Sequence, residues 1–359
     1  MPNLKNEFPI LNHYTYLNTP FTGVLSSTVH HKITALEEEY RQHGSAFMDR
    51  VEHDIISSTK LLLSEIFNAD AEHIGMLNNF STGLNLILND MPEDAKVVLL
   101  AQDYPSVNLP VKSRTFKITE VEIDLKIYEN LKSVFHYQNP DFFIFSITQF
   151  ISGFQMNIDI LRQLKSEFPH ICFIADATQY CGTEDFDFEN SPFDVFGASG
   201  YKWLNAGLGN AFFLMKPSFV DKFHFKTIGS NSLTSKPNGK PKPSGFLEPG
   251  HHDILAIARL KFALEFHYKT FGIDFIETSI KRISAQAKSH FLEFNLLDKT
   301  LIDSTSHQHI FSLEGDESFV QKLKHQGILA SFRGGRIRVG FQYYNTQDHL
   351  DLLVNAFKK

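Results

Sequence analysis

A single lysine stands in a long stretch of small and apolar residues. Lys202 lies within "GASGYKWLNAGLGNAFFLM" (197–215), and the next charged residue along the chain is Lys216. The apolar "NAFFLM" that follows the lysine is typical of a buried strand. Because lysine is rarely buried unless it is paired or used, Lys202 is either a surface residue at a strand–loop junction or a chemical group with partners nearby.

Polar residues stand at the ends of the apolar runs around this lysine. Ligands of parallel α/β sheets bind at the carboxyl ends of the strands, so residues at those ends are expected to converge. The runs end, in chain order, at Asp103–Tyr104, Gln149, Asp176 with Gln179 three residues on, and Ser199 with Lys202.

A helix is predicted to begin at the turn that contains Asn79, Ser81 and Thr82. Ser81 and Thr82 are candidate N-terminal caps of "STGLNLILNDM", and a helix N-terminus favours a phosphate. An amine, a carboxylate, an aromatic ring and such a terminus are what pyridoxal phosphate (PLP) requires. The lysine forms a Schiff base with the aldehyde, and the carboxylate keeps the pyridine nitrogen protonated. Burial of the lysine would lower its pKa and help it to act as nucleophile and proton shuttle.

Apolar runs that alternate with amphipathic stretches predict an α/β protein with a mainly parallel sheet. Strands are predicted at 96–103, 141–149, 171–176, 193–199 and 210–216, and a helix at 157–168. Residues 229–250, rich in Gly, Pro and Ser, are a candidate linker or active-site loop. A long helix, a strand at 308–313, a helix at 316–325, a strand at 336–341 and a closing helix follow. We therefore expect a large domain at 15–250 and a small α+β domain at 251–359, with segment 1–14 packed near the latter.

Composition excludes several classes of protein. The 359 residues carry a net charge of −7, so no general affinity for nucleic acid or for an anionic membrane is expected. No apolar run is long enough to span a bilayer, and residues 1–14 do not resemble a signal peptide. With Cys172 and Cys181 as its only cysteines, the chain has too few for a disulfide scaffold, and we expect a cytoplasmic protein. The adjacent pairs His30–His31 and His251–His252 lack the spacing of metal ligands on one helix face.

A set of collinear motifs resembles the class V aminotransferases, a group of fold-type I PLP enzymes that includes cysteine desulfurases, kynureninase and isopenicillin N epimerase-like proteins. Residues 173–214 are similar to the region of the cofactor lysine, with Asp176 26 positions before Lys202. The other matches are "YLNTPFTGVLS", "NNFSTGLN", "DYPSVNLP", "TQFISGFQMNID", "FLEPGHHDILAIARLKFALEF" and "RGGRIRVGFQYYNTQDHLDLLV". The resemblance implies a large domain with a seven-stranded, mainly parallel sheet flanked by helices, a small C-terminal domain, and a homodimer with shared active sites.

The resemblance also implies a role for each matching residue. Lys202 is the Schiff-base lysine, Asp176 the partner of the pyridine nitrogen, and Tyr104 the residue stacked on the ring. Gln179 and Gln149 are expected to bond the phenolic oxygen of the ring, and Ser81, Thr82 and Ser199 the phosphate. Arg338 matches the arginine that binds the substrate carboxylate, with Arg333 and Arg336 as competitors, and Asn18 is placed near the substrate.

The reaction is less narrowly defined than the cofactor. Cysteine desulfurases carry a mobile catalytic cysteine in a loop of the small domain, before or within the segment that corresponds to 315–345, whereas this chain has no cysteine after Cys181. Tyr201 precedes the lysine where many relatives have histidine. We expect an enzyme that acts at Cα of an amino acid or amine, with an aminotransferase favoured and a lyase or epimerase as alternatives. A non-catalytic descendant of the fold is the rival from another class. Loop 229–250 and "EPGHHD" are where a partner subunit is expected to contribute.

Overall fold

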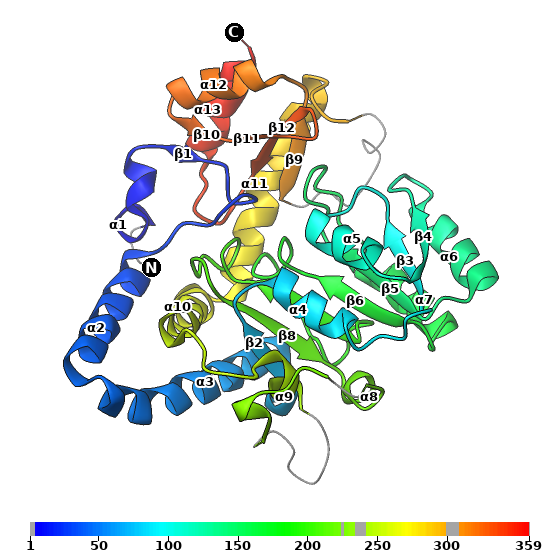
Figure 1. The fold of residues 1–359 in the computed structure, drawn as a ribbon. Coiled ribbons are helices and arrows are strands. Elements are labelled where there is room, and N and C mark those ends of the chain that lie inside the picture. Colours follow the sequence, from blue (N-terminus) through cyan, green and yellow to red (C-terminus); the bar gives the residue numbers. More distant parts are fainter. Residues whose placement is uncertain (1–3, 224–225, 234–241, 299–308, 359) are drawn as a thin grey trace.

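A seven-stranded sheet holds most of the residues singled out above (Figure 1). The computed structural model describes residues 4–223, 226–233, 242–298 and 309–358. Along the sheet the strands are β2 (Ile74–Leu77), β8 (Ala211–Met215), β7 (Val195–Ser199), β6 (Cys172–Asp176), β5 (Phe142–Ser146), β3 (Lys96–Leu100) and β4 (Lys117–Val121). All neighbours from β7 to β4 pair in parallel, and β8 is antiparallel to both β2 and β7. The predicted α/β fold with a mainly parallel sheet is confirmed.

Both faces of this sheet are buried, which explains why its strands read as continuous apolar runs. In β5, for example, Phe142 and Ile144 belong to one core, whereas Phe143 and Phe145 belong to the other. One face packs against α4 (Phe80–Leu88), α5 (Pro105–Lys112), α8 (Pro217–Val220) and α9 (Pro243–Leu247). The other packs against α3 (Ser45–Phe67), α6 (Ile127–Gln138), α7 (Ile158–Glu167) and α10 (Ile254–Leu264).

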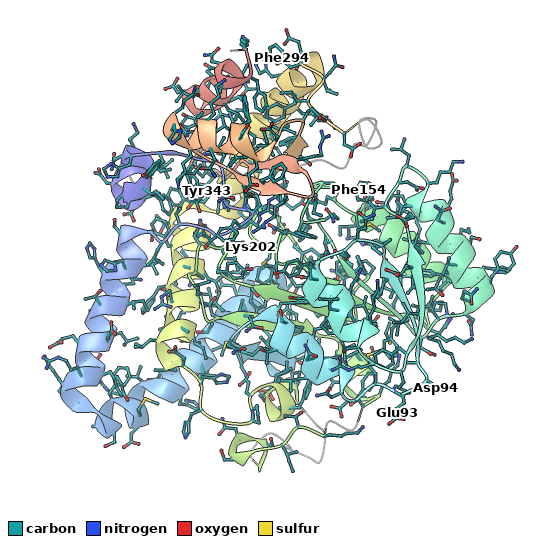
Figure 2. The ribbon with its side chains drawn as sticks, turned by 45° about the horizontal axis from the view of Figure 1, so that its top comes forward. Glu93, Asp94, Phe154, Lys202, Phe294 and Tyr343 are labelled. Carbon is teal, nitrogen blue, oxygen red and sulfur yellow. The ribbon has the colours of Figure 1, made fainter. Side chains whose placement is uncertain are left out.

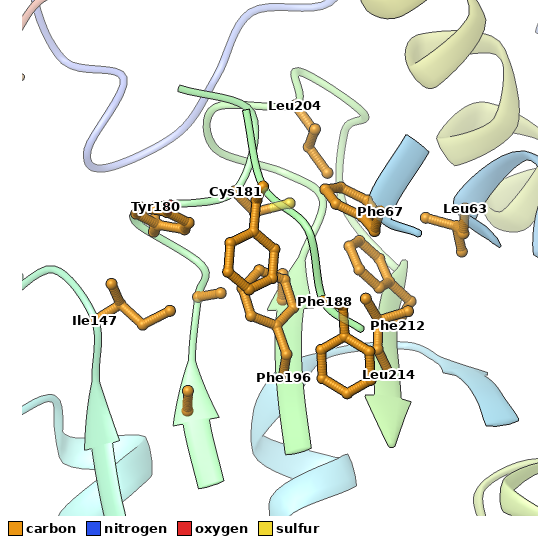
Figure 3. Packing of buried hydrophobic residues seen from close by; sticks show 14 of the residues in the cluster. Leu63, Phe67, Ile147, Tyr180, Cys181, Phe188, Phe196, Leu204, Phe212 and Leu214 are labelled. Carbon is orange, nitrogen blue, oxygen red and sulfur yellow. The ribbon is translucent and has the colours of Figure 1, made fainter. Parts of the chain in front are cut away.

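Phenylalanine side chains fill much of the core between the sheet and helices α3, α6, α7 and α10. Phe196 and Phe212 project from β7 and β8 toward Phe67 of α3, and the rings of Phe67 and Phe212 lie 5.5 Å apart between centroids (Figure 3). Such rings bury large apolar areas, so the sheet is a rigid base for the loops at its carboxyl edge.

The C-terminal part holds a second, antiparallel sheet with the order β11 (Ser331–Arg333), β12 (Arg336–Gly340), β9 (Ile310–Leu313). It packs with α11 (Ile273–Glu293), α12 (Glu317–His325) and α13 (Gln347–Phe357) around a core of its own. In Figure 1 the long helix α11 runs from the large sheet and its helices into this C-terminal part.

The N-terminal segment joins this C-terminal part. Strand β1 (Thr15–Tyr16) pairs in parallel with β10 (Ile328–Leu329), after α1 (Leu4–Glu7) and a 3₁₀ turn at Pro9–Asn12. The ring of Phe8 contacts those of Tyr343 and Tyr344, with centroids 6.1 and 5.2 Å away. Residues 4–14 thus lead into a strand that pairs with β10, and residues 1–3 lie outside the described chain; the packing of segment 1–14 near a small domain remains a prediction.

The proposed division at residue 250 remains a prediction. Helix α10 packs on α2 (Ser27–His43) and α3 in the first core, and a π-helical turn (Glu265–Phe271) links it to α11. Within α11, Ile276 and Ile280 belong to the first core, whereas Ile283 and Phe291 belong to the second. In the candidate loop 229–250 the described residues form a 3₁₀ turn (Ser230–Leu233) and α9, and 234–241 lie outside the description.

Candidate active site

Lys202 lies on the turn after β7, between the large sheet and the C-terminal part (Figure 2). Its side chain borders a cavity of about 600 Å³. Aromatic and aliphatic side chains supply most of the cavity wall, three cations supply its charge, and none of the described lining residues is acidic. The lining consists of Pro20, Phe21, Thr22, Tyr104, Pro105, Phe150, Tyr201, Leu208, Lys202, Arg333 and Arg338.

The amine of Lys202 is buried without a polar partner. The residue is 5% exposed, and its Nζ lies 5.3 Å from the ring centroid of Tyr104 and 5.5 Å from that of Tyr201. Within the described part of the chain, no hydrogen bond or ion pair reaches this nitrogen. Burial lowers the pKa of Lys202 to about 8 and Arg338 adds to this effect, whereas Asp176 opposes it. An amine with this pKa is a nucleophile and a base near neutral pH.

Asp176 ends β6 on the same edge of the sheet. Its Oδ1 accepts a hydrogen bond from the Thr178 amide at 2.8 Å. Burial raises its pKa, whereas Thr178 and Lys202 lower it. The neighbouring Asp103, which received no role from the sequence, is buried too and has a pKa raised to about 6 by burial. Its carboxylate accepts from the Tyr104 amide at 2.6 Å and thereby fixes the start of α5, so the ring of Tyr104 is held beside Lys202.

The cap of α4 corrects one expectation. Asn79, and not Ser81 or Thr82, is the N-cap: its Oδ1 accepts from the amide and hydroxyl of Thr82 at 2.8 and 3.0 Å. Asparagine caps as well as serine does, so the helix begins one residue before Ser81. The Phe80 amide donates to Ser199 Oγ at 2.9 Å, which joins the helix start to the end of β7. The phosphate roles of Ser81, Thr82 and Ser199 remain predictions.

The two glutamines differ in their placement. Gln149 Oε1 accepts from the amides of Ile151 and Ser152 at 2.6 and 2.7 Å, and the residue lines a separate cavity of about 250 Å³. The side chain of Gln179 instead joins Trp203 and Pro20, at 2.8 Å in each case. The expected bonds from both glutamines to a cofactor ring remain predictions, and the structure brings only Gln179 into contact with the segment of Lys202.

The three candidate arginines differ in their burial and in their partners. Arg336 pairs with Glu314 at 2.6 Å and lines the smaller cavity. Arg338 is 3% exposed, its Nη1 donates to the Phe150 carbonyl at 2.7 Å, and its Nε has no partner among the described residues. Burial lowers the pKa of Arg338 to about 10, with a contribution from Arg333. Arg333 is exposed and lies over the ring of Phe21, 5.8 Å from its centroid. Two arginines without acidic partners thus face the cavity of Lys202.

The donor set fits PLP. The cavity supplies an unpaired amine, a ring beside it, a neighbouring buried carboxylate and a guanidinium with unused donors. Asn18, two residues before Pro20 of the lining, has a buried Oδ1 without a partner among the described residues. The described residues contain no group of three or more potential metal ligands. His252 lies 3.5 Å from Glu248, and His251 lines a surface pocket beside α3, so within this chain neither borders the cavity.

Comparisons with known proteins agree on one family. The family model described as "Aminotransferase class-V" matches residues 16–353. Cysteine desulfurase SufS of Plasmodium falciparum is 24% identical over 299 residues, which cover 74% of this chain but only 55% of that protein, so the chain spans little more than half of this relative. A probable cysteine desulfurase of Borreliella burgdorferi is 22% identical, with 99% and 95% of the two chains covered.

Solved structures show the same fold at low sequence identity. A mutant of C-DES with glycine covalently linked to its PLP cofactor has a TM-score of 0.88 and 18% identity, with 99% and 98% of the chains covered. The cystine C–S lyase C-DES in complex with its reaction product, cysteine persulfide, has a TM-score of 0.87 and 18% identity, with 97% and 98% covered. Among the described residues, no helix is long and apolar enough to cross a membrane.

Proposed function

The chain belongs to the class V aminotransferase family of fold-type I enzymes, whose cofactor is PLP, and from this premise we propose that it is a lyase that cleaves a carbon–sulfur bond of a cystine-like amino acid. The observation that carries the proposal is a cavity that holds an unpaired lysine and two unpaired arginines but no thiol. An aminotransferase, which the sequence favoured, shares the same first step at Cα and becomes the alternative outcome of the test.

The cysteines argue against sulfur transfer through the protein. Cys172 and Cys181 are both buried, neither lines the cavity, and burial raises the pKa of both thiols. No cysteine follows Cys181 in the sequence. Sulfur cleaved from a substrate therefore has to leave with the product. C-DES, whose structure holds a cysteine persulfide product, is a neighbour of this kind.

The side chains of the cavity have distinct tasks in such a cleavage. When bound, the cofactor withdraws the electrons that the substrate leaves at Cα. Asp176 would hold the nitrogen of its ring, and Arg338 would bind the substrate carboxylate through its unused donors. Lys202 Nζ takes the proton from Cα, and the Cβ–S bond breaks so that its electron pair leaves on sulfur. Water then converts the remaining carbon skeleton into pyruvate and ammonium, which balances the reaction.

Arg333 favours a substrate with a second carboxylate. Its guanidinium lies at the edge of the cavity and forms no ion pair among the described residues, and no acidic lining residue competes for it. A disulfide-linked amino acid such as cystine carries one carboxylate for each arginine, whereas cysteine carries only one.

The test supplies the purified, PLP-loaded protein with cystine, cysteine and alanine and measures pyruvate and persulfide. We expect pyruvate and persulfide to form from cystine when no 2-oxo acid has been added as an amino acceptor. Amino transfer from alanine that depends on a 2-oxo acid, with no persulfide from cystine, would instead establish an aminotransferase. Absence of any absorbance from bound cofactor would favour the non-catalytic rival. Lys202→Ala is the control for both activities.

We also propose that the enzyme is a homodimer and that it works in the cytoplasm. Phe21 and Leu208, at the wall of the cavity, are 52% and 69% exposed, and contact with a second copy would cover such apolar side chains. The partner is expected to reach the cavity with part of 229–250 or with His251 and His252. A monomer in light scattering at micromolar concentration would contradict this proposal.

A further inference from the structure

The side chain of Gln179 is fixed in one orientation by two partners of opposite kind. Trp203 Nε1 can only donate, so the Gln179 atom 2.8 Å away is the amide oxygen. The Pro20 carbonyl can only accept, so the atom 2.8 Å from it is the amide nitrogen. One N–H and one lone pair of the amide remain available, and their directions are set.

His309 holds the backbone of the same residue from the C-terminal part. Its Nε2 lies 2.7 Å from the Gln179 carbonyl, which only accepts, so the ring carries its proton on Nε2. The ring meets the indole of Trp203 edge-on, with centroids 4.4 Å apart. His309 is 1% exposed and immediately precedes β9, and its carbonyl accepts from the Phe341 amide at 2.9 Å. Burial lowers its pKa to about 4, so the donating neutral form persists at physiological pH.

Trp203 links this arrangement to the catalytic lysine, because it directly follows Lys202. Its indole is fully buried, and its carbonyl accepts from Gln342 Nε2 at 3.0 Å. The backbone directly after Lys202 is thus anchored by Gln342, which follows β12.

We propose that His309 is a positioning residue, which orients Gln179 and Trp203 and through them the cofactor ring and Lys202. The inference rests on the proposed placement of Gln179 beside the ring, and it is independent of whether the enzyme is a lyase or an aminotransferase. A merely structural histidine would add stability, whereas a positioning histidine also affects the bound cofactor.

The experiment uses two kinds of readout other than activity, one that reports on Trp203 and one that reports on the bound cofactor. Trp203 is the only tryptophan of the chain, so the fluorescence of the cofactor-free protein reports on this one indole. The absorbance of the PLP-loaded protein, titrated with pH, and the affinity for PLP report on the cofactor. His309→Leu removes the donor, and His309→Gln keeps an N–H within reach of the carbonyl. Val339→Ala, the control, removes apolar volume from the core of the C-terminal part, and no described hydrogen bond joins Val339 to Gln179.

We expect His309→Leu to shift the tryptophan emission to longer wavelength, to weaken PLP binding about tenfold, and to move the pH midpoint of the cofactor absorbance. His309→Gln should restore most of both readouts, and Val339→Ala should leave both unchanged despite its lower melting temperature. If His309→Leu behaves like Val339→Ala, the positioning role is overturned.

Two further variants separate the inference from its premise. An unchanged absorbance midpoint in Gln179→Ala would show that Gln179 is not beside the ring. A midpoint that moves in Gln179→Ala but not in His309→Leu would overturn the role of His309 alone. Where His309→Leu does not fold, Trp203→Phe removes the donor to the Gln179 oxygen and should move the same midpoint.

Discussion

Two arginines of one strand, Arg336 and Arg338 of β12, differ in their charge partners. Arg336, at the start of β12, pairs with Glu314 and donates to the Leu296 carbonyl, so its charge already has an acidic partner, although its Nε has no hydrogen-bond partner among the described residues. Arg338, two residues on and on the same side of the strand, is more deeply buried and donates only to the Phe150 carbonyl among the bonds described. The two arginines therefore differ in whether they have an acidic partner, since none of the described residues that line the cavity of Arg338 is acidic.

The same contrast extends to the lysines. Lys165 pairs with Asp194 at 2.6 Å and Lys216 with Glu189 at 3.2 Å, whereas no ion pair reaches Lys202 Nζ among the described residues and this nitrogen lies near the rings of Tyr104 and Tyr201. Leaving buried cations unpaired costs free energy, and proteins retain such an arrangement where a ligand supplies the missing charge. The contrast therefore predicts that the paired cations compared here stabilise the fold and that the unpaired ones bind a ligand.

The largest expected effect comes from removing the unpaired lysine. Lys202→Ala should lower turnover of cystine by about 10⁴-fold or more, because it deletes the base and the site of covalent cofactor attachment. Lys216→Ala, which removes a paired lysine from the same segment, should leave turnover within about twofold. Steady-state pyruvate release measures both, and equal losses in the two variants would break the division.

Truncation of the unpaired arginine should give the next largest effect. Arg338→Ala should raise KM about a hundredfold, because a buried arginine that binds a carboxylate in two places contributes several kcal/mol. Arg338→Lys should restore little, since a lysine lacks the planar pair of donors. Arg336→Ala is the matched control and should lower the melting temperature while KM stays the same. A rise of KM in Arg336→Ala alone would reverse the assignment.

A paired cation should matter for stability instead. Asp194→Asn leaves Lys165 without its charge partner, and the side chains of the pair are only 10% and 22% exposed. We expect a loss of about 2 kcal/mol in the free energy of unfolding, which is less than for a fully buried pair because water reaches the lysine. Urea unfolding measures the loss, and kcat per folded enzyme should not change. A kcat that falls with stability intact would place this pair in the catalytic machinery.

Much of the fold could be predicted because most strands of the large sheet are buried on both faces. Runs such as 142–146 are continuous and end in polar residues, so strands and site residues were found together. β4 was missed because its residues are largely solvent-accessible or only partly buried and include Lys117 and Glu120, so the apolar signal is weak.

The site could be predicted only as far as chain position determines it. Lys202 and Asp176 follow from the ends of their strands. The choice of Arg338 over Arg336 depends on where Glu314 lies, and the bonds of Gln149 depend on the turn of its own loop. No pattern in the sequence indicated a role for His309, because the residue that it contacts, Gln179, is 130 positions away in the chain.

The smallest expected effect concerns the mutual repulsion of the unpaired cations. With a pKa of about 8 for Lys202, the amine form increases about tenfold between pH 7 and pH 9 and then levels off, whereas an ordinary lysine with a pKa of 10.5 would continue to gain amine above pH 9. The rate at which the cofactor-free protein captures PLP covalently should follow this curve, when read by absorbance at constant ionic strength.

Arg338→Gln removes a positive charge that lowers the pKa of Lys202 and should move the midpoint to higher pH. Asp176→Asn removes the negative charge that raises it and should move the midpoint to lower pH. An unchanged midpoint in both variants would mean that burial alone sets the pKa of Lys202, and the electrostatic link between Lys202 and Arg338 would then be refuted.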